Sequence, residues 1–169
     1  MPPFTIRVFG DPVLRTPAAE VTEFDGALQR LASDMLETMY DAPGVGLAAP
    51  QVGIQKRIFV YDVGEGPGAV VNPTIHETTG EWTYEEGCLS VPALYWPIVR
   101  PAEVHLTGYD LDGNEVEIRA TELMARMLQH EVDHLDGTLL LARLTPEQRK
   151  EAMRELRERE TRGVAPPRG

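Results

Sequence analysis

The sequence predicts an α+β fold. Four segments of strand character form two consecutive pairs, which indicates antiparallel hairpins, and two helical patterns follow them in the C-terminal third. One strand does not alternate with one helix along the chain, so a parallel sheet is not expected. The length of 169 residues fits one domain. We expect this catalytic domain to span residues 1–162, with residues 163–169 as a disordered tail.

Three helices are predicted from periodicity and end signals. Apolar residues recur at spacings of three and four from Asp25 to Met39, which places them on one helix face. A second helix lies within residues 120–137, with Thr121 as a possible N-cap and Gly137 just past its end. The third, over residues 145–160, opens with Thr-Pro and is highly charged.

The strands are predicted from β-branched and aromatic runs bounded by turn residues. Residues 57–63 and 69–75 form one pair, joined by the turn sequence G-E-G-P-G. Residues 103–119 alternate apolar and polar side chains on both sides of Asp112-Gly113, which is typical of a hairpin. Both pairs are expected to be antiparallel.

Composition and charge exclude several classes of partner. Hydrophobic and charged contents of 42% and 25% are those of an ordinary soluble protein. A formal charge of -11 argues against a nucleic-acid surface spread over the molecule, so no DNA partner is expected. The chain shows neither a secretory signal nor a membrane-spanning run, which predicts a cytoplasmic protein without a membrane partner. A single cysteine, Cys88, rules out an intramolecular disulfide.

A candidate metal site lies in the second helix, where His130, Glu131 and His134 form the pattern H-E-x-x-H. On a helix the two histidines lie ~40° apart, one turn from each other, so both can reach one ion. Glu131 lies ~60° from His134, where it can reach a metal-bound water. Leu123 and Met127 place this face in an apolar stripe, and inward-facing imidazoles need partners.

The third ligand has several candidates. Zinc peptidases with this pattern use a distant glutamate or a third histidine, but no histidine follows His134. His76 and His105 are interpreted as surface residues of their strands. Cys88, in a predicted Gly-Cys turn, could present a thiolate, and a Cys-His-His set leaves a fourth position open for chemistry.

Three stretches together resemble the peptide deformylase family. These are G-V-G-L-A-A-P-Q at residues 44–51, E-G-C-L-S at 86–90 and Q-H-E-V-D-H at 129–134. The G-D-P-V-L-R segment at 10–15 is also similar, and the resemblance extends in the right order to about residue 145. It implies small antiparallel sheets around a central helix that carries both histidines, with a C-terminal helix.

The resemblance also implies a role for each matching residue. The metal ligands would be Cys88, His130 and His134, and Glu131 would be the general acid and base. The Gln51 side chain and the Leu89 backbone N–H would stabilise the oxyanion, and the backbone from Gly44 through Val45 to Gly46 would lie along the substrate.

The implied reaction is hydrolysis of the formamide of N-formylmethionyl peptides. Fe(II) is the expected ion, although zinc, nickel or cobalt could occupy the same ligands in purified protein. Four residues are nominated for the substrate pocket: Val45, Gly46, Leu123 and Met127. Tyr84 and Tyr95 could line the site too, although many family members have an arginine near the position of Tyr95.

Glu86 has two possible roles. It could accept a hydrogen bond from a ligand histidine or pair with Arg100, which would fix the imidazole. The alternative is an ordinary salt bridge on the surface.

Three other functions compete with this interpretation. The G-V-G-L-A-A segment fits a dinucleotide-binding pattern, but that pattern must follow a strand and open a helix, whereas here a helix precedes it. A different metallo-amidase or peptidase would share the chemistry, and a non-catalytic module would share only the fold.

The C-terminal helix suggests one further partner. Residues 145–162 carry six basic and five acidic side chains, a formal charge of +1 in a chain of -11. The apolar residues Ala152, Met153 and Leu156 are few, which predicts a solvent-exposed helix. We hypothesise that its basic residues give weak, salt-sensitive docking to the ribosome.

Overall fold

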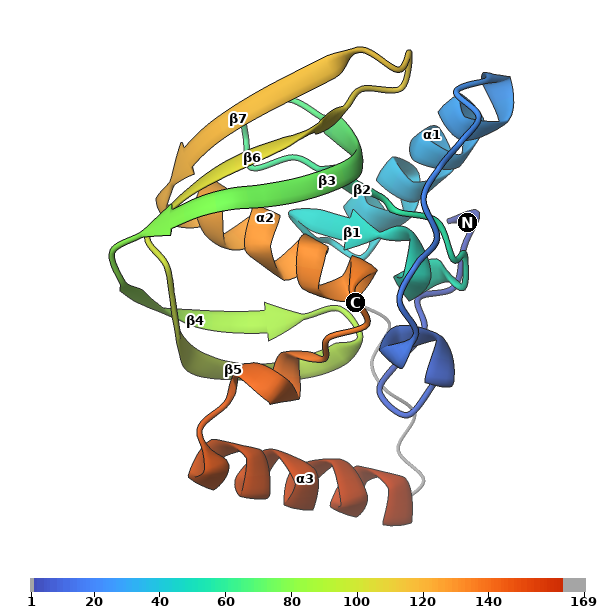
Figure 1. The fold of residues 1–169 in the computed structure, drawn as a ribbon. Helices are drawn as coiled ribbons and strands as arrows, with labels where there is room; N and C mark the ends of the chain where they lie inside the picture. Colours follow the sequence, from blue (N-terminus) through green and yellow to red (C-terminus); the bar gives the residue numbers. More distant parts are fainter. Residues whose placement is uncertain (1, 163–169) are drawn as a thin grey trace.

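The fold has a central helix between two antiparallel sheets. The computed structural model describes residues 2–162 (Figure 1). Helix α2 (Glu122–Leu135) lies between a five-stranded sheet and a two-stranded sheet. The five-stranded sheet has the order β1 (Gly46–Ala48), β2 (Ile58–Tyr61), β3 (Gly68–Thr79), β6 (Glu103–Tyr109) and β7 (Glu115–Thr121). The two-stranded sheet pairs β4 (Trp82–Cys88) with β5 (Val91–Arg100). The α+β architecture predicted from the sequence is therefore confirmed.

The remaining helices flank this core. Helix α1 (Gly26–Asp41) packs beside β1 and β2, and α3 (Pro146–Thr161) lies below the β4–β5 sheet (Figure 1). Three short 3-10 helices connect the elements: η1 (Pro12–Arg15), η2 (Ala49–Val52) and η3 (Leu140–Arg143). Within residues 2–162, none of these helices is both long and apolar enough to cross a membrane. The predicted disordered tail at 163–169 lies outside the described residues.

Strand β2 is buried on both faces, which explains its continuous apolar sequence. Phe59 packs in one core cluster with Leu128 and Leu135 of α2, whereas Ile58 and Val60 pack in a second cluster with α1. Successive side chains of a strand point to opposite faces, so α1 and α2 cover opposite sides of this part of the sheet. Phe59 pairs with Val70 on β3, and Val70 packs in the same cluster as Phe59. The next residue, Val71, packs in the cluster with α1, so β3 alternates between the two clusters as β2 does.

Most predicted ends agree with the structure. The Asp25 side chain caps α1 by accepting from the Leu28 N–H, and Thr145 caps α3 in a reciprocal capping box with Gln148. Thr121 does occupy the N-cap of α2, but its side chain makes no capping hydrogen bond.

The hairpin of β4 and β5 was not predicted. Strand β4 has the burial pattern of a largely exposed strand, without the alternation that sequence reading depends on. Cys88 is its last residue and the turn is formed by Leu89 and Ser90, so the predicted Gly-Cys turn is wrong. The cysteine is thus held by strand pairing, opposite Val91.

Helix α3 is not fully solvated, contrary to the prediction. Ala152 is buried, and Met153 and Leu156 pack against a third cluster. That cluster consists of Ile98, Leu140, Leu141, Leu144 and Ala152. Three apolar residues on one face therefore suffice to dock α3, while its remaining faces stay charged.

Gly137 allows the chain to turn directly after α2. Its φ is +74°, and a Cβ at this position would lie 2.8 Å from the carbonyl carbon and oxygen of Arg15. Both the backbone conformation and the close approach of the N-terminal segment require glycine.

We predict that Gly137→Ala lowers the free energy of unfolding by roughly 1–3 kcal/mol, because alanine meets both left-handed strain and a backbone clash. Chemical denaturation measures the loss. Gly80→Ala is the matched control, since Gly80 has a φ of +70° but its Cβ would meet only the Ala102 side chain at 3.3 Å. An equal loss in both variants would show that the contact with Arg15 contributes nothing.

Candidate metal centre and catalytic cavity

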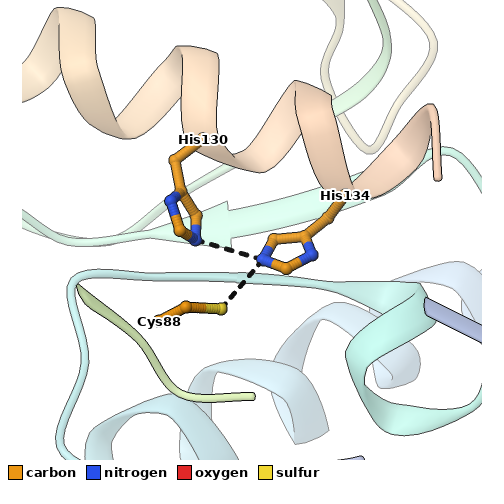
Figure 2. Close-up of side chains that lie close together, drawn as sticks. All are labelled: Cys88, His130 and His134. Carbon is orange, nitrogen blue, oxygen red and sulfur yellow. Dashed lines mark hydrogen bonds between the residues drawn. The ribbon is translucent and has the colours of Figure 1, made fainter. Parts of the chain in front are cut away.

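Three potential metal ligands converge from α2 and β4 (Figure 2). The Nε2 atoms of His130 and His134 are 3.1 Å apart, and the Cys88 sulfur lies 3.3 Å from Nε2 of His134. All three ligand atoms lie within 4.8 Å of one another. The helix spacing of four residues brings the imidazoles to one side, and the end of β4 brings the sulfur to them.

The donor chemistry of this cluster fits a cation. Nδ1 of His130 donates a hydrogen bond to Glu86 Oε2 at 2.8 Å, which leaves Nε2 as the ring nitrogen that faces the cluster. A thiolate and an imidazole nitrogen that presents its lone pair repel each other unless a positive charge lies between them. A metal ion meets that requirement with these ligands.

The electrostatics of the cluster favour its ionised forms. Burial raises the pKa of the Cys88 thiol, but the charges of His134 and His130 outweigh it and hold that pKa well below its usual value. The thiolate is the form that binds metal ions. For Glu86, burial also acts to raise the pKa, and hydrogen bonds from His130 and Arg100 overcome it, so the pKa is strongly lowered.

Glu131 has the opposite behaviour. Burial raises the pKa of its carboxyl, and among residues 2–162 its Oε1 atom has no hydrogen-bond partner. Its other oxygen approaches β1, since a Cβ at Gly46 would lie 2.5 Å from Glu131 Oε2. Only glycine at this position leaves room for the carboxylate. A buried carboxylate with a raised pKa beside a group of potential metal ligands is suited to exchanging a proton.

A buried network of charges holds the cluster in place. The Arg100 guanidinium donates to both oxygens of Glu86, at 2.8 and 2.7 Å, and to Asp133 Oδ2 at 2.9 Å. Arg143 donates to both oxygens of Asp133. Glu86 and Arg100 are both buried, so the alternative of a surface salt bridge is wrong. Glu86 accepts a hydrogen bond from the potential ligand His130 and also pairs with Arg100, which are the two contacts expected of it.

Sequence reading missed three members of this network, Arg143 on η3 and two residues on α2. Arg126 donates from Nη1 to Glu86 Oε1 at 2.6 Å, and Asp133 joins Arg100 to Arg143. Both residues lie on α2, but their partners on other elements are far away in sequence. Both are charged residues that are buried in the helix, and buried charges need partners. This was the only signal in the sequence that could have indicated their place in the network.

The cluster lies in the wall of a cavity of about 590 Å³. Two of the proposed metal ligands, Cys88 and His130, and the carboxylate of Glu131 line it. It is also lined by every other residue nominated from the sequence: Val45, Gly46, Gln51, Tyr84, Leu89, Tyr95, Leu123 and Met127. His134 is the exception and lies behind Cys88, next to a much smaller void.

Gln51 is held next to the cysteine. Its side chain is almost completely buried, and its Oε1 accepts from the Ala48 N–H at 3.0 Å. This contact turns the amide nitrogen toward Ser90 Oγ, 3.1 Å away, and Cys88 Sγ, 3.7 Å away. An amide N–H donor therefore lies at the cluster in a fixed orientation.

The other two histidines lie elsewhere. His76 on β3 and His105 on β6 stack on each other with ring centroids 5.2 Å apart, and His76 contacts Thr107. Neither belongs to the group of potential metal ligands.

The dinucleotide interpretation also fails. The segment after α1 forms β1 and then only the short 3-10 helix η2, so it opens no α-helix that could bind a pyrophosphate.

Comparison with known proteins places the chain in one family. The sequence profile of the family described as polypeptide deformylase matches residues 3–150. The chain is 52% identical over 158 residues to a peptide deformylase from Acidothermus cellulolyticus, an alignment that covers 94% of this chain and 88% of that protein. It is 55% identical over 140 residues to one from Agathobacter rectalis, covering 83% and 89%.

Solved structures show the same fold. A peptide deformylase from Legionella pneumophila superposes with a TM-score of 0.88 at 41% identity, covering 96% of this chain and 99% of that one. One from Synechococcus elongatus, solved in complex with actinonin, has a TM-score of 0.88 at 39% identity, covering 92% and 89%. The chain belongs to the polypeptide deformylase family.

Proposed function

We propose that this chain removes the formyl group from nascent N-formylmethionyl peptides with a metal ion held by Cys88, His130 and His134. The reaction is that of its family, hydrolysis of the formamide C–N bond to release formate and a free N-terminal amine. The observation that carries the residue assignment is the convergence of the three ligand atoms within 4.8 Å, next to Glu131, whose Oε1 has no hydrogen-bond partner among residues 2–162. A thiolate as the third ligand argues against a general metallopeptidase, and the intact cluster argues against a non-catalytic module.

The residues around the cluster have complementary tasks in this reaction. When bound, the metal supplies Lewis acidity that polarises the formyl oxygen and acidifies water. Glu131 takes a proton from the attacking water and delivers it to the leaving nitrogen, for which its raised pKa is suited. The Gln51 amide and the Leu89 backbone N–H donate to the negative charge that develops on the formyl oxygen. One such preorganised donor typically lowers a barrier by about 2.7–4 kcal/mol.

The methionine side chain is expected to bind in the apolar part of the cavity. Leu123 and Met127 lie on the same face of α2 as the histidines, and Val45 approaches from the loop before β1. The half-exposed Val45 and the backbone of Gly46 would lie along the substrate. Tyr84 and Tyr95 are both exposed and line the same cavity, which supports the expectation that they line the substrate site.

Fe(II) is the proposed physiological ion. One sulfur and two imidazole nitrogens also suit zinc, nickel and cobalt, which could replace it in purified protein. We place the reaction in the cytoplasm, where formylated chains are made. We assign it to a single domain over residues 1–162.

We predict that Glu131→Gln keeps its metal and loses turnover of a formyl-Met peptide by roughly 10²–10⁴-fold, because an amide neither accepts the proton of water nor returns it. Metal analysis and a formate-release assay on the same preparation separate the two effects. Glu147→Gln, an exposed isosteric change on α3, is the control. Activity within tenfold of the unmodified protein would remove Glu131 from the role of base.

We predict that Cys88→Ser weakens metal binding, because a serine hydroxyl stays protonated near neutral pH whereas a metal-bound thiol ionises. Titration with Zn(II) against a competing chelator measures the affinity. His76→Ala and His105→Ala are controls and should bind as the unmodified protein does. Unchanged affinity in the serine variant, with a loss in either control, would move the third ligand away from Cys88.

The proposed docking to the ribosome rests on the solvated face of α3. Lys150, Arg154 and Arg157 are exposed there, while the opposite face packs on the cluster around Ile98 and Leu144. Removing the whole helix would uncover that cluster, so charge reversal on the exposed face is the better test.

We predict that replacing Lys150, Arg154 and Arg157 together by glutamate lowers co-sedimentation with ribosomes at low salt and leaves turnover of a short formyl peptide unchanged. The control reverses three exposed basic residues on other surfaces, Arg30, Lys56 and Arg119, so the change in net charge is identical. If both triple variants co-sediment equally, the helix is not the docking surface.

A further inference from the structure

We propose that Arg126 is a positioning residue of the metal centre, which fixes β4 along α2 so that the Cys88 sulfur meets the two imidazoles. This inference rests on the proposed function, in which Cys88, His130 and His134 hold the ion. The claim concerns how the sulfur is placed, and it assigns Arg126 no contact with the substrate.

Arg126 contacts three alternate residues of β4. Its Nη1 donates to Glu86 Oε1 at 2.6 Å, and its Nη2 donates to the backbone carbonyl of Trp82 at 2.5 Å. Its guanidinium carbon also lies 5.3 Å from the ring centroid of Trp82 and 5.6 Å from that of Tyr84. Only 4% of this side chain is exposed, although it lines the cavity, and Tyr84 is 41% exposed. Burial of the guanidinium strengthens its charged hydrogen bonds and its cation–π contact with Trp82.

The face of β4 that Arg126 contacts and the face of α2 that carries Arg126 both lead to the potential metal ligands. Residues at every second position of a strand share a face, as Trp82, Tyr84 and Glu86 do on β4. Cys88 is the next alternate residue, and the pairing with β5 shifts register between Gly87 and Cys88. Residues four apart on a helix also share a face, which places His130 and His134 after Arg126 on α2.

The two faces meet as three successive rungs. Arg126 bonds Glu86 and Trp82, His130 bonds the same Glu86 at 2.8 Å, and His134 lies 3.3 Å from Cys88. Arg126 forms the first rung, so it sets how far β4 is displaced along α2. A shift by even a fraction of one residue at the first rung would carry the sulfur away from the imidazoles, since β4 rises ~3.3 Å per residue.

Arg126 and Arg100 hold β4 in different ways. Arg100 belongs to β5, the partner strand of β4, and ties that hairpin to Asp133 near the C-terminal end of α2. Arg126 acts from the N-terminal half of α2 and reaches the start of β4 at Trp82. Arg100 lies directly opposite Trp82 in the hairpin, so both arginines act at its open end and join it to different halves of α2.

The test uses Co(II), whose charge-transfer absorption with a thiolate reports the Cys88 contact without turnover. We expect Arg126→Met to raise the dissociation constant for Co(II) by roughly 10- to 100-fold and to weaken the thiolate band. Arg126→Lys should be intermediate, because one ammonium cannot span Glu86 and the Trp82 carbonyl as the planar guanidinium does. Arg149→Met is the matched control, since it removes one hydrogen bond from arginine to a carbonyl, that of Leu141, at the start of α3.

Each result decides a different point. Affinity and thiolate band equal to those of the unmodified protein in Arg126→Met would overturn the inference, as would an equal loss in Arg149→Met, which would indicate general destabilisation. A weaker affinity with an unchanged thiolate band would also contradict it, because the sulfur would then be correctly placed. If Arg126→Met does not fold, Arg126→Lys decides by the same criteria. Absence of a thiolate band in the unmodified protein would instead contradict Cys88 as a ligand, and with it the proposed function.

Discussion

The buried carboxylate of Glu86 is the interaction on which the site depends. It receives hydrogen bonds from Arg100, Arg126 and His130, which come from β5 and α2, while Glu86 itself belongs to β4. The β4–β5 hairpin shares little apolar core with α2, so this carboxylate joins the two parts of the metal centre. One of those parts carries the cysteine and the other carries both histidines.

Such a network is costly to bury and costly to break. Two charges taken out of water lose several kcal/mol each of hydration, and their attraction recovers this only when the geometry is good. Here each oxygen of the Glu86 carboxylate has two hydrogen-bond partners. The guanidinium of Arg100 donates to both Glu86 and Asp133. Removing one partner of such a buried pair typically costs about 3–5 kcal/mol. The same network orients the imidazole of His130, so stability and metal binding are coupled at Glu86.

How much the sequence could predict depended on whether the signal was local. The helix with His130 and His134 was found from spacing alone, because residues four apart must share a face. Cys88 lies 42 positions before His130. Its assignment as the third ligand needed the resemblance to a family, because no local rule joins a helix to a distant strand. The hairpin that carries Cys88 was missed because β4 is largely exposed and shows no alternation. Arg126 was missed because Glu86, its main partner, lies 40 residues upstream.

The central claim is that Cys88, His130 and His134 bind one metal ion together, and X-ray absorption of the zinc-loaded protein tests it most directly. The account predicts one sulfur at about 2.3 Å from zinc and two imidazole nitrogens at about 2.0–2.1 Å. In the Cys88→Ser variant the sulfur contribution should disappear while the imidazole contribution remains. A shell of nitrogen and oxygen alone in the unmodified protein would contradict the account.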